Sequence, residues 1–377
     1  MNSKLSTPYI EAGKINAGMP YLEEDTGVSV SSYEFMPSWV FYTPVVLQSL
    51  LLAVRYGDIR LPLVANPTIF LSGMVGESKH DILVLAGPVA KPWISPFISL
   101  IKTQDSLDDQ DTHAKQELEK ANLTFPIVAK PDLGCRGVGV KLVKNEQQLK
   151  SYIDSYPLGA RYLLQEKAPY EAEAGVFYVR YPNESKGKII SITLKYTPSV
   201  VGDGVCTLKE LIEQSPRAGK LSHLYFPRHE DKLDWVLPEG EEFQLAFAGS
   251  HSRGSIFRDG NKYITEQLTR KMDEILADVD GYYYGRLDVK FRDIHSFMEG
   301  ENFTILELNG ASSEAAHIWD RNTPLKEIYK TLLSQYRMLF EIGAQQKKLG
   351  HRPASIKTLI GAWKEEKELM KHYPMTD

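Results

Sequence analysis

The chain of 377 residues has few cysteines, no block of basic residues and no long hydrophobic run. Its two cysteines, Cys135 and Cys206, cannot form a disulfide framework, so we expect a reducing compartment, the cytoplasm. The net charge is −5 and the lysines and arginines are not clustered. The charge pattern therefore predicts neither a nucleic-acid partner nor electrostatic binding to a membrane.

The most apolar stretch, residues 40–54, is shorter than the roughly 20 residues that a membrane-spanning helix needs. We expect no membrane span there, but a buried helix that begins at Thr43-Pro44, because proline is favoured in the first turn of a helix. A role at a membrane surface is the alternative. The N-terminus has no apolar signal core, and the chain has no internal repeat or low-complexity tract.

The length predicts two or three domains of ordinary globular composition. Residues 36–105 resemble an α/β unit, with a helix near 43–56 and strands at 61–65 and 81–87. Hydrophobic periodicity and capping residues predict further elements along the rest of the chain. The helices are at 106–120, 145–156, 208–214, 264–279, 325–346 and 356–371, and the strands at 123–129, 161–165, 175–180, 187–195, 285–291 and 303–310.

Two alternating segments, residues 285–291 and 303–310, place polar side chains at every second position. In the first, Arg286, Asp288 and Lys290 share one face. In the second, Glu307 and Asn309 share a face with Phe303 and Ile305. If the two strands are neighbours, Asp288, Glu307 and Asn309 form a cluster of oxygen ligands suited to Mg²⁺. The alternative is a solvated outer face of an antiparallel sheet.

A glycine-rich loop follows Lys130-Pro131, with Gly134, Gly137 and Gly139. Glycine allows a close backbone approach and positive φ, so successive N–H groups of such a loop can surround phosphate oxygens. Lys130 and Arg136 would supply positive charge. A β-hairpin kinked by glycine is the alternative. The pattern is not a dinucleotide fingerprint, because no helix begins at the third glycine.

Residues 162–176 run from one predicted strand into another. Such an extended segment can present backbone C=O and N–H groups to the edge of an adenine, and Glu173 can accept hydrogen bonds from ribose hydroxyls. An acidic, solvated loop is the alternative. A second glycine-containing stretch, residues 72–79, does not fit the phosphate loop of nucleoside triphosphatases, because Glu77 and Ser78 separate Gly76 from Lys79.

These motifs occur in the order seen in ATP-grasp ligases, and over about residues 115–345 the chain resembles D-alanine:D-alanine ligase. Residues 200–212 resemble the corresponding part of cyanophycin synthetase and of bifunctional glutathione synthetases. The resemblance implies an ATP-grasp fold of the α/β (α+β) class, with two α+β subdomains clasping ATP after an N-terminal α/β domain. The expected domains are residues 1–105, 106–195 and 196–349, followed by a C-terminal helix at 350–377.

The resemblance also implies roles for individual residues. Lys130 and Lys195 would contact the ATP phosphates, and Arg286 the acyl phosphate. Asp288, Glu307 and Asn309 would hold two Mg²⁺ ions, with Mn²⁺ as an alternative. The nucleotide-binding set would comprise Lys130, Gly134, Arg136, Gly137, Val138, Gly139, Gln165, Glu166, Lys167, Pro169 and Glu173.

Substrate contacts are expected from three loops, for which structural or surface roles are the alternatives. His251 and Arg253 could bind a carboxylate or the departing phosphate, and we place Arg253 with Arg286 and Lys195 as catalytic. The other candidates are Glu77, Ser78, Lys79, Ser312, Ser313 and His317. The chain departs from the D-alanine enzymes at Cys135-Arg136-Gly137, where they carry serines, and again directly after Asn309.

The implied reaction joins a small-molecule carboxylate to an amine, through an acyl phosphate, with release of ADP and phosphate. The resemblance also suggests a homodimer. Two other hypotheses stay open: a kinase of the same fold that phosphorylates a hydroxyl, and a protein that binds nucleotide without turnover.

Overall fold

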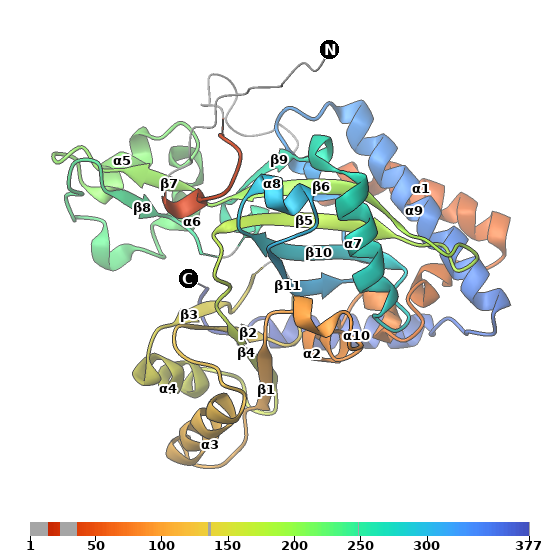
Figure 1. Ribbon diagram of the computed structural model, residues 1–377, viewed down its shortest axis with the longest axis horizontal. Helices are drawn as coiled ribbons and strands as arrows, with labels where there is room; N and C mark the ends of the chain where they lie inside the picture. The colour runs from red at the N-terminus through yellow and green to blue at the C-terminus, as the bar shows by residue number, and fades with distance from the viewer. Residues whose placement is uncertain (1–13, 23–35, 135–136, 248, 377) are drawn as a thin grey trace.

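The computed structural model describes residues 14–22, 36–134, 137–247 and 249–376. Two separate antiparallel sheets organise these residues (Figure 1). The larger sheet has the order β11-β10-β5-β6-β9 and the smaller the order β1-β4-β2-β3. The larger contains β5 (Ala172–Val179), β6 (Lys188–Tyr196), β9 (Ile256–Asp259), β10 (Tyr284–Phe291) and β11 (Phe303–Asn309). The smaller contains β1 (Phe97–Ile101), β2 (Ile127–Pro131), β3 (Lys141–Val143) and β4 (Arg161–Glu166).

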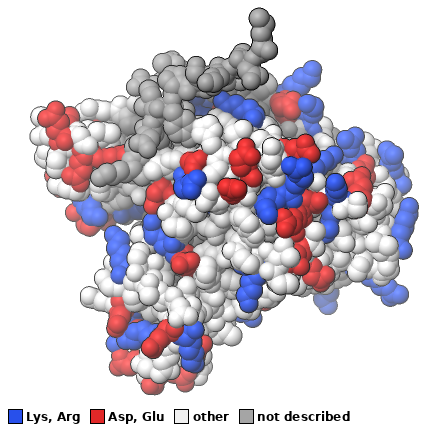
Figure 2. Space-filling view, in the orientation of Figure 1, with Lys and Arg blue, Asp and Glu red and all other residues white. Residues whose placement is uncertain are grey.

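One face of the larger sheet packs against α7 (Glu266–Ala277) and α8 (Ile294–Met298), with α7 in front in Figure 1. Leu268, Met272 and Ile275 recur at helical spacing and lie in one core with Leu287 and Val289 of β10. The outer side of α7 carries both signs of charge, as Figure 2 shows across this side of the molecule. The opposite face of the sheet packs on Leu339 and Ile342 through Phe177 and Tyr284, and its remaining part holds polar groups.

The smaller sheet is covered by α3 (Leu107–Lys120) and α4 (Glu146–Asp154). Helix α3 begins where the Ser106 side chain accepts a hydrogen bond from the Asp109 N–H, with acidic residues in its first turn and Lys120 in its last. This helix and α4 confirm the predictions for 106–120 and 145–156 to within a few residues.

A separate small unit is inserted between β6 and β9, and lies at the left in Figure 1. It contains β7 (Ser199–Val201), α5 (Leu208–Gln214), α6 (Ser222–Tyr225) and β8 (Glu242–Gln244) around a hydrophobic core of its own. A capping box between Thr207 and Glu210 starts α5, which agrees with the predicted helix at 208–214.

Helix α1 (Ser38–Tyr56) packs lengthwise on α9 (Leu325–Lys348). The prediction of a buried helix that begins at Thr43-Pro44 is wrong in two respects. The helix begins at Ser38 and contains Pro44, and only its inner side is buried, through Phe41, Val45 and Leu52. Among the described residues, α1 is the single helix long and apolar enough to cross a membrane, and 17% of that stretch is buried.

The strands predicted at 61–65 and 81–87 are also wrong. Residues Leu61–Val64 form a 3-10 helix that packs against α9, and Lys79–Leu83 form α2. Short apolar runs fit a buried helical turn as well as a strand, so periodicity could not separate the two. The described residues before β1 therefore contain no named strand, and β1 itself pairs with β4 across the expected domain boundary at 105.

The two sheets divide the chain between β4 and β5, whereas the sequence placed the end of the first subdomain at residue 195. The C-terminal helix α10 (Ile356–Leu369) lies beside the smaller sheet and α2 in Figure 1, and Glu366 accepts a hydrogen bond from the Gly76 N–H. The last described residues continue from α10 toward β3.

Strand β10 has the alternation that its sequence predicts, but β11 does not. A register shift places Asp288 opposite Glu307 and the next residue, Val289, opposite Ile305, so Leu306 is an extra residue in the ladder. This β-bulge reverses the phase of the strand. Glu307 and Asn309 consequently share a face with Asp288, and not with Phe303 and Ile305 as predicted.

Candidate active site

The polar face of the larger sheet collects charged side chains from four strands. Residues directly opposite one another in an antiparallel pair project on the same side. Asp288 lies opposite Gly175 of β5 and opposite Glu307 of β11, while Glu173 lies opposite Lys195 of β6. The next pairs add Lys290, Arg286 and Asn309 to this face.

Lys195 is the centre of the cluster. Its Nζ lies 3.1 Å from Glu173 Oε1 and 3.0 Å from Asp288 Oδ1, and its side chain is only 2% exposed. Burial would lower the pKa of Lys195, but the two carboxylates outweigh burial and raise that pKa. Lys195 is therefore a fixed positive charge on the polar face.

Asp288 accepts a second charged donor, because Arg286 Nε lies 3.1 Å from its Oδ1. Burial alone would raise the pKa of Asp288, but Arg286 and Lys195 outweigh it and hold the pKa below its ordinary value. Asp288 is consequently ionised at neutral pH. Arg286 also donates to the backbone carbonyl of Glu314, at 3.4 Å, which orients the guanidinium toward the segment after β11.

Gly175 allows the side chains of Lys195, Asp288 and Arg286 to pack closely together. A Cβ at position 175 would lie 3.1 Å from Arg286 Cδ, and 3.5 Å from both Asp288 Oδ1 and Lys195 Cε. Glycine in a strand interior often marks such a close approach. The absence of a side chain at position 175 leaves the space that the three charged groups occupy.

Lys130, at the end of β2, links the smaller sheet to the bulge in β11. Its Nζ donates to Gln165 Oε1 at 2.7 Å and to the Leu306 carbonyl at 3.0 Å. Gln165 Nε2 donates to the same carbonyl at 3.3 Å. Burial lowers the pKa of Lys130 to about 8. The two predicted nucleotide-binding residues thus meet at the junction of the sheets.

The predicted substrate loop before α2 reaches the same junction. Lys79 Nζ donates to the Gly134 carbonyl at 2.8 Å and lies 3.7 Å from Glu307 Oε1. Glu77 Oε1 accepts the Gly310 N–H at 2.5 Å, directly after Asn309. Burial, and then the charge of Glu307, raise the pKa of Glu77 to about 8.

The glycine loop has the predicted backbone, since φ is +123° at Gly134, +69° at Gly137 and +72° at Gly139. Val138 lies within it, whereas Arg136 is outside the described residues. The C-terminal segment packs on this loop. Thr376 Oγ1 accepts the Gly139 N–H and donates to the Gly137 carbonyl, both at 2.9 Å.

The predicted adenine segment links β4 to β5. Its first backbone groups are already engaged, because the Glu166 N–H donates to the Pro96 carbonyl and the Glu166 carbonyl accepts from Ser95 Oγ. The Lys167 side chain pairs with Glu171, and Pro169 is exposed. Glu173, predicted to bind ribose, is instead paired with Lys195 in this structure.

The contacts recorded for the other predicted substrate residues are with segments other than β10 and β11. Ser78 caps α2 and donates to Asp132, while the ring of His251 stacks on Trp319. Ser312 donates its N–H to the Gly73 carbonyl, and Ser313 Oγ donates to the Gly310 carbonyl. The side chain of Arg253 is outside the described part of the structure, although its backbone ends the short helix His251–Arg253.

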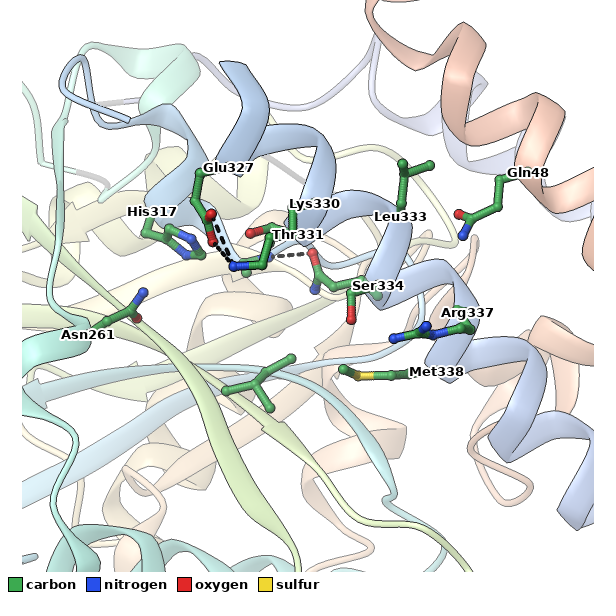
Figure 3. Close-up of a pocket in the computed structure, with 13 residues that line it drawn as sticks. Gln48, Asn261, His317, Glu327, Lys330, Thr331, Leu333, Ser334, Arg337 and Met338 are labelled. Atoms are coloured by element: carbon green, nitrogen blue, oxygen red, sulfur yellow. Dashed lines mark hydrogen bonds and ion pairs between the residues drawn. The ribbon is translucent and has the colours of Figure 1, made fainter. Parts of the chain in front are cut away.

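His317 is 4% exposed, with Nδ1 2.6 Å from Ser191 Oγ, and burial lowers its pKa, which favours the neutral imidazole. It lines a cavity of about 480 Å³ beneath α9 (Figure 3). Lys330 and Glu327 form an ion pair beside His317 in this view, and Gln48 reaches the cavity from α1. His317 alone, of the described residues predicted to contact substrate, lines this cavity.

The donor set on the polar face fits a divalent cation. Asp288, Glu307 and Asn309 supply two carboxylates and an amide oxygen on one side of β10 and β11. Mg²⁺ is commonly held by one or two carboxylates, with phosphate and water completing its coordination. Within the described ranges, no three His, Cys, Asp or Glu side chains are grouped to hold a metal alone, so substrate oxygens would have to contribute.

Sequence reasoning did not single out three residues that the structure brings to this site. Asp132 accepts from Ser78 Oγ and the His80 N–H. The other two are Gly175 and Thr376. Lys290, which the sequence placed on one face with Arg286 and Asp288, lies 3.9 Å from Glu173 Oε2. The position of Asp132 directly after Lys130-Pro131 and the glycine at the start of the strand predicted at 175–180 were usable signals. No local feature of the sequence indicated that Thr376 would lie at this site.

Residues 83–177 match the RimK family model, described as a RimK-like ATP-grasp domain. The cyanophycin synthetase of Synechocystis sp. is 26% identical over 215 residues, which cover 52% of this chain and 24% of that protein. The chain thus spans about a quarter of the length of this relative. These two matches confirm the resemblance to ATP-grasp ligases and, with the two α+β units, the ATP-grasp fold.

Two solved structures are similar at low identity. The D-alanine–D-alanine ligase of Bacillus anthracis complexed with ATP is 14% identical, with a TM-score of 0.41, over 75% of this chain and 72% of that one. A bifunctional glutathione synthetase from Pasteurella multocida is 16% identical, with a TM-score of 0.33, over 68% of this chain and 36% of that one.

Proposed function

We propose that this chain, which carries an ATP-grasp domain, is an ATP-dependent ligase that activates a carboxylate as an acyl phosphate and joins it to an amine. The observation that carries the proposal is the cluster on the polar face of β10 and β11. There Lys195, Arg286 and Lys79 surround the oxygen donors Asp288 and Glu307. Such a set can neutralise a triphosphate beside a second anion.

Charge neutralisation is the main physical task of this reaction, because a carboxylate and the terminal phosphate of ATP repel each other. Lys130 and Lys195 would bind the phosphate oxygens, and the N–H groups of residues 134–139 would cover them. Lys130 is well placed for this role, because it already joins the smaller sheet to β11. Mg²⁺ held by Asp288, Glu307 and Asn309 would supply further charge neutralisation when bound.

Arg286 would orient the acyl group and stabilise the oxyanion that forms when the amine adds. Its guanidinium lies between Asp288 and the backbone of Glu314, so it faces the segment that follows β11. The acyl phosphate must be kept from water. Closure of the glycine loop over the site would exclude that water. His317 and its cavity are a second place where part of a substrate could bind.

A hydroxylamine assay separates the three hypotheses. The protein is incubated with ATP, Mg²⁺, hydroxylamine and a panel of amino acids and other carboxylates. A ligase gives ADP together with a hydroxamate, because hydroxylamine captures the acyl phosphate. A kinase gives ADP and a stable phosphorylated alcohol with hydroxyl substrates, and a binding protein gives neither product.

Variants test the assignment of the site. Asp288→Ala and Glu307→Ala should abolish ADP release while the protein stays folded, as judged by circular dichroism. Glu301→Ala is the matched control, since Glu301 is an exposed carboxylate two residues before β11. ADP release that persists in both site variants would remove the metal assignment. The cytoplasmic location and the absence of nucleic-acid partners remain predictions.

A further inference from the structure

The outer side of α1 is an apolar surface with no partner among the described residues. We name it the α1 stripe. Its residues, with their exposed fractions, are Trp39 (77%), Val40 (38%), Val46 (55%), Leu47 (58%), Leu50 (49%), Leu51 (71%), Val54 (83%) and, just after the helix, Ile59 (50%). The helix is therefore apolar on both sides, and one side is buried on α9.

Covering this surface would leave few polar groups without partners. The hydroxyl of Thr43, within the stripe, donates to the Trp39 carbonyl at 2.6 Å, and Ser49 Oγ donates to the Val45 carbonyl at 2.8 Å. Arg55 is the one charged residue of the helix and lies at its end. Burial of the stripe thus removes apolar surface from water and leaves neither hydroxyl without a hydrogen-bond partner.

The size of the stripe points to a protein interface. Its eight side chains expose on the order of 800 Å², about the area that each partner buries in a stable interface of ordinary size. Isolated apolar patches on monomeric proteins are commonly smaller, roughly 300–600 Å². Two copies of this one surface would be enough for a stable dimer.

A membrane fits less well. A helix that lies in a membrane interface has a polar face rich in Lys and Arg, whereas the face of α1 opposite the stripe packs on α9 through Phe41, Val45 and Leu52. A span would require α1 to leave that core. The stripe runs along the length of the helix, so two copies can pair antiparallel, which brings the same surface of each copy together as a two-fold interface requires.

We propose that two copies of this chain pair through their α1 stripes, with the helices antiparallel about a two-fold axis near Leu47. Leu47 lies at the middle of the stripe, so each copy of it would face its own counterpart. Trp39 of one copy would lie near the Val54 end of the other. The pairing would also support α9, whose inner side lines the cavity of His317.

Sedimentation velocity on the full chain tests the pairing. The unchanged protein should be dimeric at micromolar concentration, and Leu47→Glu with Leu51→Glu should raise the dissociation constant at least 100-fold. Val205→Glu is the matched control, because Val205 is 79% exposed but lies in the small unit between β7 and α5. This control should remain dimeric.

Cross-linking tests the orientation, in a background in which Cys135 and Cys206 are serine. Leu47→Cys should form a disulfide-linked dimer under mild oxidation. Val54→Cys should not, because antiparallel pairing separates its two copies by about 20 Å. Efficient linking through Val54→Cys would show a parallel arrangement and overturn the two-fold geometry.

Other outcomes overturn the pairing itself. These are a monomer at all concentrations, or a dimer that survives both glutamates. Flotation of monomeric protein with vesicles of phosphatidylcholine and phosphatidylserine would assign the stripe to a membrane instead. None of these measurements depends on catalysis, so they leave the proposed ligase activity to its own test.

Discussion

At the scale of single residues, the site is a set of mutually satisfied charges. Lys195 lies between Glu173 and Asp288, and Lys79 lies between the Gly134 carbonyl and Glu307. Nucleotide phosphates would have to replace several of these contacts with charge-assisted bonds of their own. The balance between the present contacts and those with phosphate therefore controls the affinity for nucleotide. A small displacement of one charged side chain should also shift the others.

The space at position 175 provides a test of this coupling. Gly175→Ala should lower kcat/KM at least tenfold, because the new Cβ lies 3.1 Å from Arg286 Cδ and would displace the guanidinium. Steady-state ADP release measures the effect. Gly361→Ala in α10 is the control, since a Cβ there meets nothing within 4 Å. Unchanged kinetics in Gly175→Ala would mean that Arg286 does not need its present position.

Glu77 predicts a pH dependence of stability. Its pKa is raised to about 8, so the folded state holds this proton more tightly than the unfolded state, which releases it near pH 4.5. The stabilisation is complete below about pH 4.5 and is lost as the pH rises to about 8. The slope is at most about 1.4 kcal/mol per pH unit.

Denaturant unfolding of the protein and of Glu77→Gln, both without divalent cations, measures this contribution. The free energy of unfolding of the unchanged protein should fall relative to that of Glu77→Gln between pH 5 and 8. Taking the difference cancels the titration of the other groups. A difference that stays constant over this range would show that Glu77 is ionised throughout.

At the scale of elements, the C-terminal segment packs against the glycine loop and is hydrogen-bonded to it. Tyr373 packs against Gly134 and Gly139, its ring stacks on Tyr156, and Thr376 bonds to Gly137 and Gly139. The Gly139 N–H is one of the donors expected to cover phosphate, and Thr376 already occupies it. Nucleotide binding would therefore compete with the C-terminal segment.

Thr376→Val should consequently lower KM for ATP, by about threefold to tenfold, because a hydrogen bond of roughly 0.5–1.5 kcal/mol no longer has to be displaced. Initial rates of ADP release at varied ATP measure the change. Thr358→Val, on the exposed start of α10, is a matched control. A higher KM in Thr376→Val would show that the contact holds the loop ready for ATP.

At the scale of the whole molecule, the site lies where the two sheets meet. Lys130 and Gln165 from the smaller sheet both reach the Leu306 carbonyl of the larger sheet. A ligand that contacts both sheets should stabilise the molecule as a unit, by about 2.7 kcal/mol at a concentration 100 times its Kd.

We therefore expect ATP with Mg²⁺ to raise the Tm by several degrees in a thermal unfolding experiment. ATP with EDTA should give a smaller shift, and Asp288→Asn should remove most of the effect of Mg²⁺. The expectation fails if ATP shifts the Tm equally with and without Mg²⁺ in the unchanged protein.

Much of the architecture could be predicted locally. Capping residues and periodicity placed α3, α4, α5 and α7, and the alternation in β10 assigned Arg286, Asp288 and Lys290 to one face. Glycines at 134, 137 and 139 predicted the positive φ angles of the loop. These features depend on spacing and backbone preference within a few residues, so the sequence carries them directly.

Other features depend on contacts between distant segments. The extra residue Leu306 reverses the phase of β11, and the Leu306 carbonyl is bound by Lys130 and Gln165, from strands about 140 to 180 residues away. The turns at 61–64 and 79–83 are helical because they pack on neighbours that the local pattern does not reveal. Exposure of the α1 stripe follows from which side of α1 meets α9.

The amino-acid sequence alone thus determined which groups are available for the proposed chemistry: lysines, an arginine, two carboxylates, an amide and a glycine loop, in an order that resembles ATP-grasp ligases. Only the tertiary structure decided which of them meet. It joined Lys79 to the loop and to Glu307, turned Glu307 toward Asp288, and left His251 against an aromatic ring. The reason is physical: residue type is a local property, whereas a charge cluster is built by strand pairing and packing across the whole chain.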